Sequence, residues 1–399
     1  MLFTKRKENE LSSPIFDMNN SDVYITKTSV YLPNDPISND DMEVYLGVIN
    51  EQASKSRRIV LRNNGIKSRY YALTKDGKST HTNAQMASYA IRQLAENNDE
   101  VLKSIELLCC ATSSPEQLMP SHAVMVHGWL PETGNIEVVS PAGVCCAGMH
   151  ALKYAYMSIK LGQVEKAVSA ASERLSPSLK ADKFELEVKK LALLEENPYV
   201  SFDKDFLRWM LSDGAGAFML ENKPSTSGIS LRIDWIEGYS FANEMEACMY
   251  MGAEKMEDGS LKSYLDFDPN EVVNQSIMSI KQDVKLLGAN IVTLGFKKLK
   301  LSLDKKGIDA SQIDYFLPHM SSYFFEDKMY DEMKNLGMEI PKEKWFTNLG
   351  SKGNVGAASI YLMLDELFNS GKLQKGQTIL LGVPESSRFS YVFSLLTVC

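Results

Sequence analysis

Two kinds of apolar segment alternate along the chain. Short runs of small and apolar residues, such as LLCCA at 107–111, AVSAASE at 167–173 and TILLGVPE at 378–385, are typical of buried strands. Longer segments with helical spacing, HALKYAYMSIKLG at 150–162 and ASIYLMLDELFNSG at 358–371, end at a glycine, as helices often do. This alternation predicts an α/β fold with helices packed on a mostly parallel sheet.

An internal repeat organises these segments. SIELLCCATSS at 104–114 aligns without gaps with QIDYFLPHMSS at 312–322, and the same offset brings Cys146-Ala147-Gly148 opposite Asn354-Val355-Gly356. We therefore expect two pseudosymmetric halves, 22–222 and 223–399, joined near the polar stretch ENKPSTSG. The charged segment 177–204 has no counterpart in the second half. We interpret it either as an inserted lid or dimer element, or as a solvated surface helix.

Composition narrows the classes of function. The chain has 399 residues, 44% of them hydrophobic, and 43 basic against 51 acidic residues give a net charge of -8. A general nucleic-acid binder would need a basic surface, so we do not expect one. No apolar run approaches the length of a membrane span, and we expect a cytoplasmic protein. Adjacent cysteines rarely form disulfides and no metal-ligand spacing occurs, so we expect reduced thiols, no metal and no cofactor.

Cys146 is the first candidate for chemistry. It stands where an apolar run meets a small-residue turn and a helix begins, in SPAGVCCAGMHALKYAYM. Unpaired amides and the helix dipole at such a position stabilise a thiolate, so we expect its pKa to be lowered. The alternative is a buried, inert cysteine. We assign that role to Cys145, because two adjacent side chains cannot both point into one cavity from this turn.

The repeat adds two further candidates. It brings Asn354 opposite Cys146 at the start of the equivalent helix, and it puts His319 just beyond the strand equivalent to LLCCA. Clefts form at the carboxyl ends of strands in such sheets, so the three groups can converge between the halves. A cysteine with two neutral hydrogen-bond donors suits acyl-thioester chemistry with an enolate as second substrate. Taken singly, His319 or Asn354 would more simply be a structural residue.

Together these motifs resemble the β-ketoacyl-acyl-carrier-protein synthase III branch of the thiolase-like condensing enzymes. The resemblance begins near Val23 and rests on SRRIVLRNNGIKSRYY, CCAGM, SDGAGAFML, DYFLPHM and SKGNVGAASIYLML. It implies a five-layer αβαβα thiolase fold, a homodimer, and a catalytic triad of Cys146, His319 and Asn354 in which Cys146 carries the acyl chain. It also implies acyl carrier protein or coenzyme A thioesters as partners.

The chain departs from the family pattern in three places. The glycine triplet that shapes the oxyanion hole is replaced within PESSRFSYV, Met320, Ser321 and Ser322 follow the histidine, and Arg58 stands where the family has a tryptophan. These features are most similar to the DarB and StlD ketosynthases, which join a β-ketoacyl and an unsaturated oxoacyl chain into a cyclohexanedione, the dialkylresorcinol precursor. We expect Ser387, Arg388, Phe389 and Met119 to line the altered pocket.

Two other functions remain open. The chain would be a chain-initiating synthase III using malonyl-carrier protein if the altered loop did not change the reaction, or a non-catalytic subunit of a condensing complex. An acidic carrier protein needs a basic patch near the entrance. The candidates for carrier or pantetheine docking are Arg57, Arg58, Arg62, Lys297, Lys298 and Lys300. The lysines can equally be a charge run on a solvated helix.

Overall fold

The computed structural model describes residues 21–49, 57–183 and 207–399. Most of the segment 177–204, for which the sequence leaves two interpretations, lies outside these described residues. None of the described helices is both long and apolar enough to cross a membrane.

The first half of the chain contributes five strands to the main sheet. Their order across the sheet is β1 (Tyr24–Tyr31), β7 (Gly214–Glu221), β6 (Lys166–Glu173), β4 (Leu107–Ala111) and β5 (Glu137–Val139). Strand β4 is parallel to β5 and β6, whereas β7 is antiparallel to both β6 and β1. Every residue of β4 is buried, as expected for the apolar run LLCCA between two helical layers.

The second half repeats this strand order. Strands β8 (Leu231–Ser240), β15 (Ser390–Val398), β14 (Thr378–Glu385) and β13 (Tyr315–Pro318) follow one another across the sheet. Trp345 forms a parallel bridge with Phe316 of β13 where the first half has β5. Strands β1 and β8 pair only at two positions, so nine of the described strands form one sheet with a narrow join between the halves.

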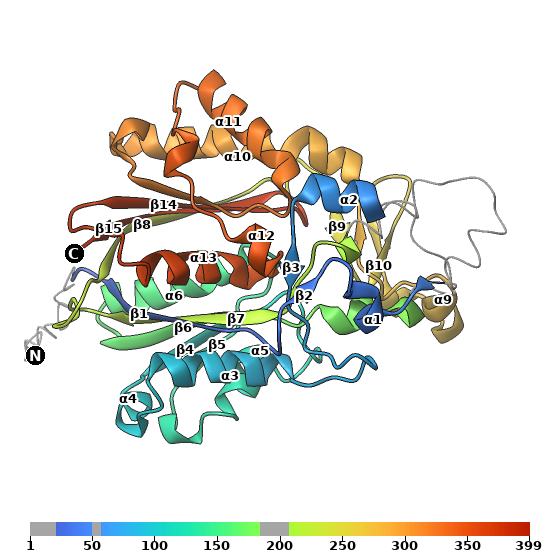
Figure 1. The fold of residues 1–399 in the computed structure, drawn as a ribbon, viewed down its shortest axis with the longest axis horizontal. Helices are drawn as coiled ribbons and strands as arrows, with labels where there is room; N and C mark the ends of the chain where they lie inside the picture. The colour runs from blue at the N-terminus through green and yellow to red at the C-terminus, as the bar shows by residue number, and fades with distance from the viewer. Residues whose placement is uncertain (1–20, 50–56, 184–206) are drawn as a thin grey trace, which may run out of the picture.

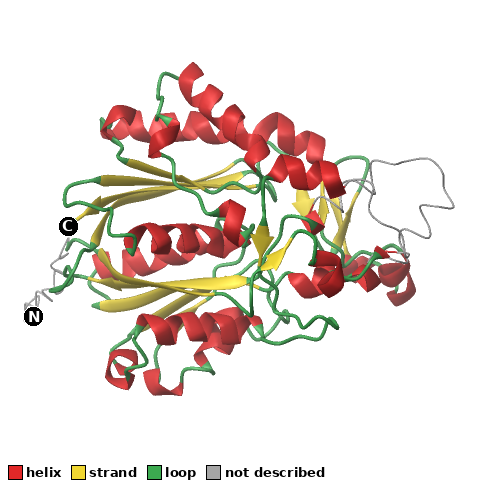
Figure 2. Ribbon diagram, in the orientation of Figure 1, coloured by secondary structure: helices red, strands yellow, loops and turns green. Residues whose placement is uncertain are grey.

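Helices and sheets alternate in five layers (Figures 1 and 2). Helices α6 (Ala147–Lys160) and α13 (Ser359–Phe368) lie between the two halves of the sheet. Helices α3 (Asn83–Leu94), α4 (Asp99–Lys103) and α5 (His122–His127) cover one outer face, and α10 (Val284–Lys306) and α11 (Glu326–Asn335) cover the other. The expected thiolase fold of two pseudosymmetric halves is thereby confirmed. The expectation of a mostly parallel sheet is wrong, because five of the eight neighbouring strand pairs in the main sheet are antiparallel. The exact boundary at residues 222 and 223 stays a prediction.

The two central helices approach each other closely at one point. A Cβ atom added to Gly148 of α6 would lie 2.4 Å from the carbonyl oxygen of Ala357, which precedes α13. Tyr361 of α13 donates a hydrogen bond to the carbonyl of Gly148 at 2.8 Å, and its ring stacks on Phe218. Glycine at position 148 therefore lets the central layer close, and this closure fixes the ends of both helices against the sheet.

Small elements surround the end of the sheet at which the candidate residues lie. They are α1 (Met42–Leu46), α2 (Arg57–Asn64), α9 (Pro269–Asn274), α12 (Leu349–Lys352), β2 (Ile37–Ser38), β3 (Ser68–Arg69), β9 (Met249–Tyr250), β10 (Ala253–Lys255), β11 (Leu261–Ser263) and β12 (Lys281–Gln282). Figure 1 shows α1, α2, α9, β9 and β10 grouped beyond one end of the two sheet layers, and α12 beside α13.

Candidate active site

Cys146 is the N-cap residue of α6, as the sequence predicts, and its side chain is completely buried. Its thiol donates a hydrogen bond to the carbonyl of Val383 at 3.3 Å. Its backbone N–H donates to the Glu385 carboxylate at 3.0 Å, and the N–H of Val144 donates to the same oxygen at 2.8 Å. The turn that presents the proposed nucleophile is thus tied to the end of β14.

The expected lowering of the Cys146 pKa is wrong for this arrangement. Burial raises the pKa of the thiol well above its ordinary value, and the neighbouring negative charge of Glu385 raises it further. The sequence predicts unpaired amides at the helix start, but the Glu385 carboxylate accepts from one of them, the N–H of Cys146, and brings a negative charge beside the thiol. In this state Cys146 is a neutral thiol.

Alternate residues of β14 face opposite sides at this point. Val383 and Glu385 contact the Cys146 turn, whereas Gly382, Pro384 and the following Ser386 line a cavity on the other side. Cys145 lines that cavity and Cys146 does not. The two thiols therefore face different surroundings, as expected for adjacent side chains. However, Cys145 and not Cys146 lies beside the cavity, the reverse of what the sequence predicts.

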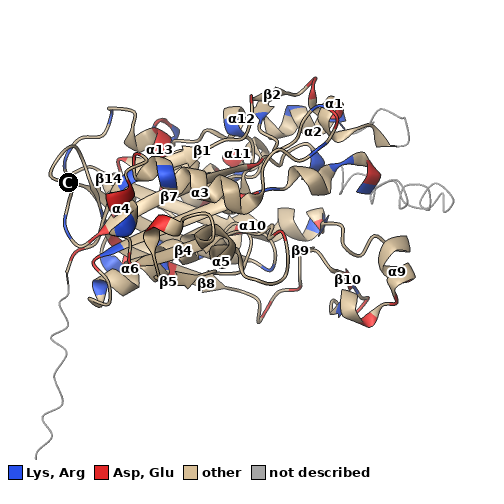
Figure 3. Ribbon diagram, turned by 90° about the horizontal axis from the view of Figure 1, so that it is seen from below, with Lys and Arg blue, Asp and Glu red and all other residues tan. Residues whose placement is uncertain are grey.

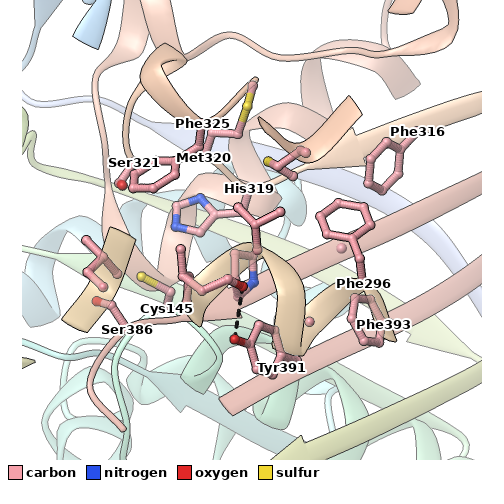
Figure 4. Close-up of a pocket in the computed structure, with 17 residues that line it drawn as sticks. Cys145, Phe296, Phe316, His319, Met320, Ser321, Phe325, Ser386, Tyr391 and Phe393 are labelled. Atoms are coloured by element: carbon pink, nitrogen blue, oxygen red, sulfur yellow. Dashed lines mark hydrogen bonds between the residues drawn. The ribbon is translucent and has the colours of Figure 1, made fainter. Parts of the chain in front are cut away.

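The cavity lies between β13, β14, β15 and helices α10 and α11. Its lining is almost entirely apolar, with Phe296, Phe316 and Phe393 at one end. Cys145, Ser321 and Ser386 lie at the other end, beside His319 (Figure 4). The remaining lining residues are Leu287, Ile291, Val292, Gly295, Met320, Phe325, Met329, Gly382, Pro384 and Tyr391. Such a lining suits a hydrocarbon chain with a polar reacting end.

His319 directly follows β13, as the repeat predicts. Its backbone N–H donates to the carbonyl of Gly382 at 2.8 Å, next to the residue whose carbonyl accepts from Cys146. Burial lowers the pKa of the imidazole to about 4, so the ring is neutral at physiological pH. Its buried Nδ1 has no hydrogen-bond partner among the described residues. A neutral imidazole with an unused nitrogen can exchange a hydrogen bond with a substrate oxygen.

Asn354 lies in the loop between α12 and α13. Its side-chain oxygen accepts from the N–H of Gly356 at 3.0 Å, which leaves the amide NH₂ as the group that can donate to a substrate. Gly356 has φ of 48°, and a Cβ there would lie 2.8 Å from an oxygen of Glu173. The glycine thus lets this loop approach the buried carboxylate at the end of β6.

Comparison with known proteins gives the same enzyme class as the sequence motifs. Residues 303–383 match the family model 3-Oxoacyl-[acyl-carrier-protein (ACP)] synthase III C terminal. The β-ketoacyl-[acyl-carrier-protein] synthases III of Aquifex aeolicus and Chlorobaculum tepidum are 23% and 25% identical, and each alignment covers 90% of this chain and 94% of the relative. The chain is a ketosynthase III-like condensing enzyme.

Solved structures support the fold of this ketosynthase. AbyA1, described as a tetronic acid condensing enzyme, superimposes with a TM-score of 0.73 at 18% identity over 94% of this chain and 99% of that one. Xanthomonas campestris OleA with bound lauric acid and lauroyl-CoA gives a TM-score of 0.69 at 18% identity, with 95% and 99% coverage. At these identities the likeness concerns the fold alone.

The predicted pocket residues of the ketosynthase occupy four different environments. Ser387 donates to Glu385 at 2.6 Å, and the exposed Arg388 donates to the carbonyl of Met245. Phe389 is buried with φ of 59°, a strained conformation for a bulky residue, in the tight turn between β14 and β15. Met119 is 82% exposed. Not one of these four is among the residues that line the cavity, although Ser386 beside them is.

The predicted docking residues also separate into two groups. Arg57 pairs with Glu43 and lies over the Trp209 ring, Lys298 lies over Tyr239 and Phe241, and Lys300 pairs with Asp304. The exposed ones are Arg58 and Arg62 on α2 and Lys297 on α10. Figure 3 shows acidic and basic residues mixed over the ketosynthase.

An open polar cleft lies between the loops that follow His319 and precede Asn354. Its lining is Gly65, Lys67, Ser68, Tyr323, Gly350 and Ser351. The cleft adjoins the end of α2, the helix that carries Arg58 and Arg62. This position makes it the candidate entrance for a carrier-bound chain.

Sequence reasoning missed two carboxylates. Glu385 bonds the Cys146 turn, and Glu173 accepts from the N–H groups of Ser113 and Ala357, each at 3.0 Å. Burial raises the pKa of Glu173. The sequence signal for Glu385 was its position inside the stretch that replaces the glycine triplet, but only the residues after it were considered.

Proposed function

We propose that this enzyme joins two acyl thioesters through an acyl-Cys146 intermediate, and that it condenses and cyclises a β-ketoacyl and an unsaturated oxoacyl chain to a cyclohexanedione. The observation that carries the proposal is the apolar cavity that ends at His319. A long hydrocarbon chain fits its phenylalanine- and methionine-rich lining better than a two-carbon acetyl group does. The structural neighbour OleA, solved with bound lauric acid and lauroyl-CoA, agrees with a long-chain substrate.

The proposed reaction begins with transfer of an acyl group to Cys146. The thiol loses its proton, sulfur attacks the thioester carbonyl, and the carrier thiol leaves with a proton. The carbon between the two carbonyls of the β-ketoacyl partner then loses a proton and adds to the unsaturated chain. Claisen attack on the Cys146 thioester closes the ring and expels the Cys146 thiol. The thioester of the β-ketoacyl partner stays on the ring until water cleaves it and releases the carrier thiol. Because two carbonyls already acidify that carbon, the nucleophilic enolate forms without decarboxylation.

His319 and Asn354 are proposed to stabilise the enolate. The neutral imidazole and the free NH₂ group of Asn354 supply hydrogen bonds without a positive charge. His319 can also receive the proton from carbon, although its low pKa makes it a weak base. The structural neighbour AbyA1, described as a tetronic acid condensing enzyme, agrees with a condensation that also makes a ring.

The proposed partners are acyl carrier protein or coenzyme A thioesters and a second copy of the chain. Exposed Arg58 and Arg62, on the helix that leads into the polar cleft, support carrier docking. Strand β5 is the edge strand of the sheet in the described structure, and exposed Leu118 and Met119 belong to the same half. An unpaired edge with exposed apolar side chains favours a homodimer.

Mass spectrometry of the intact enzyme tests the proposal. The enzyme is incubated separately with acetyl, β-ketoacyl and unsaturated oxoacyl thioesters, and each adduct is weighed. We expect a long-chain adduct and, with both long substrates present, a released cyclic product. A stable acetyl adduct that condenses with malonyl-carrier protein would instead identify a chain-initiating synthase. Absence of every adduct would favour a non-catalytic subunit.

A further inference from the structure

Glu385 binds two backbone amides in the turn that leads into α6, one of them that of the N-cap residue Cys146. One carboxylate oxygen accepts from Val144 at 2.8 Å and from Cys146 at 3.0 Å, and the other accepts from the Ser387 hydroxyl at 2.6 Å. The side chain is only 6% exposed. Three short hydrogen bonds thus hold one buried carboxylate in place.

The same amides have a second use in acyl transfer. When a thioester reacts with a sulfur, its carbonyl oxygen becomes negative and needs hydrogen-bond donors beside that sulfur. The backbone N–H of the attacking cysteine is directed to this position, and the start of a helix adds its positive dipole end. An N–H that donates to Glu385 is not available to the substrate oxygen.

Several charged or titratable groups surround this contact. Cys146 faces Glu385 from β14, Tyr391 from β15 and its neighbour Cys145, and His150 of α6 faces Glu385. Glu385 is the carboxylate that acts on the Cys146 thiol, whereas both Glu385 and Glu173 act on Cys145. Glu385 is therefore the charge at which the state of Cys146 can be changed without changing the cavity.

We propose that Glu385 is a positioning residue that holds the Cys146 turn closed, and that acyl transfer requires its carboxylate to leave the amides of Val144 and Cys146. This inference rests on the proposed role of Cys146 as nucleophile. The other carboxylate oxygen keeps its hydrogen bond from Ser387 when the side chain of Glu385 rotates slightly. The amides of Val144 and Cys146 then lose the Glu385 oxygen as acceptor and can donate to the thioester carbonyl oxygen instead. The enzyme would then generate its reactive thiolate only when an acyl donor has displaced the charge beside it.

Alkylation of Cys146 by iodoacetamide measures the thiolate without any acyl chemistry. The rate is followed against pH for each cysteine by peptide mass spectrometry in the wild type, E385Q and E385A. We expect the wild-type midpoint for Cys146 to lie above the ordinary thiol pKa of about 8.5. E385Q removes the charge and keeps a hydrogen-bond acceptor, so it should lower the pH midpoint of Cys146 alkylation by about one unit. At pH values below both midpoints, Cys146 should then react roughly tenfold faster in E385Q than in the wild type.

The control is E173Q, which removes a buried carboxylate that acts on Cys145 but not on Cys146. It should leave the Cys146 profile in place. Thermal unfolding establishes that each variant is folded. An unchanged midpoint in folded E385Q and E385A overturns the proposal. If neither folds, a wild-type midpoint at or below about 8.5 overturns it equally, and a midpoint above that value supports it.

Acyl loading separates this proposal from the proposed function. E385A leaves the amides open, so a short thioester should acylate it faster than the wild type. Loss of loading in folded E385A would mean that Glu385 assists acylation, which contradicts the closed state. A shifted alkylation profile without loading of any cysteine in any variant would reject the proposed function while leaving the role of Glu385 intact.

Discussion

At the scale of single residues, the two adjacent cysteines pose the sharpest question. Cys146 matches the family motif and starts α6, but its thiol is buried against β14, and Cys145 is the one that lines the cavity. The sequence motif therefore selects the Cys146 sulfur, whereas the resting geometry places the Cys145 sulfur beside the cavity. Release of the Glu385 contact is the step that would reconcile them.

We predict that Cys146→Ala abolishes acylation and that Cys145→Ala retains it. The helix-start amides can serve an acyl group on Cys146 once Glu385 has left them. Peptide mapping of the acyl-enzyme locates the adduct in each variant. An adduct that maps to Cys145 in the wild type would transfer the nucleophile role to the cavity-lining thiol.

His319 and Asn354 should act after acylation. Neither donates to the Cys146 thiol in the structure, and both keep a polar group for a substrate. His319→Ala and Asn354→Ala should accumulate a stable acyl-enzyme and slow condensation by about 10²–10³-fold, the usual effect of losing one oxyanion donor. Single-turnover kinetics separates the two steps. If folded His319→Ala no longer acylates, the histidine instead generates the thiolate.

Acid should destabilise the protein through its buried histidines. Burial lowers the pKa values of His122 and His319 to about 4, whereas the unfolded chain has about 6.5. The unfolded state thus binds more protons between these values, so this stability is complete above pH 6.5 and is lost as the pH falls towards 4. Each histidine contributes on the order of 3 kcal/mol.

The measurement compares urea unfolding of the wild type, H122N and H319N at pH 7 and pH 5. Each variant should lose less stability on acidification than the wild type does. The comparison with the wild type is essential because burial raises the pKa values of Glu173 and Asp213, whose protonation in the folded state acts in the opposite direction. Equal losses in all three proteins would contradict the depressed histidine pKa values.

The sequence predicts the candidate residues better than their states. His319 lies where the repeat puts it, directly after β13, because a strand end is a local feature. Asn354 instead lies in the loop before α13 and not at the first turn of that helix. The pKa of Cys146 was predicted in the wrong direction because it depends on Glu385, a partner 239 residues away. The sequence alone does not show that the end of β14 lies against the Cys146 turn, and so it gives no sign of the contact with Glu385.

At the scale of elements, the closest contact between α6 and the start of α13 gives a direct test. Gly148→Ala would put its Cβ 2.4 Å from the Ala357 carbonyl oxygen, so the helices must separate. We expect a destabilisation of about 1–3 kcal/mol, typical of overpacking.

The control is Gly288→Ala in α10, where the added Cβ meets no atom within 4 Å. It should stabilise by about 0.5–1 kcal/mol. Urea unfolding of both variants measures the difference, and equal effects would contradict the close contact.

Element prediction succeeded where periodicity is strong. LLCCA, AVSAASE and TILLGVPE coincide with β4, β6 and β14, and α6 begins directly after Cys146. The small elements between β8 and α10 were not predicted, because two- or three-residue strands such as β9 to β12 carry no periodic pattern. The turn at Phe389 was also missed, since a left-handed phenylalanine has no sequence signal.

At the scale of the whole molecule, charge should guide the carrier. The net charge of -8 opposes an acidic partner, and exposed Arg58 and Arg62 on α2 provide a local exception. Charge reversal at both should weaken turnover with carrier-bound substrate, more so at low salt, and should spare a short thioester. Steady-state kinetics at two ionic strengths measures the loss of turnover with each substrate.

The control is Lys300→Glu, because Lys300 is already paired with Asp304. Equal loss with both substrates would mean that the arginines support the fold.

The two pseudosymmetric halves followed from the repeat because each half builds the same order of strands, whereas the five-layer arrangement followed from the family resemblance. The join between the halves did not follow, since it depends on the short pairing of β1 with β8. That pairing brings β1 to the middle of the sheet, between β7 and β8.

This central position of β1 has a consequence during synthesis. Tyr31 pairs with Ala215, so at roughly 5–20 residues per second the first strand leaves the ribosome on the order of 10–40 s before its partner. During that interval β1 is an unpaired strand that can associate with other nascent chains. The yield of active enzyme should therefore depend on the speed of translation and on chaperones that hold this strand until its place in the sheet exists.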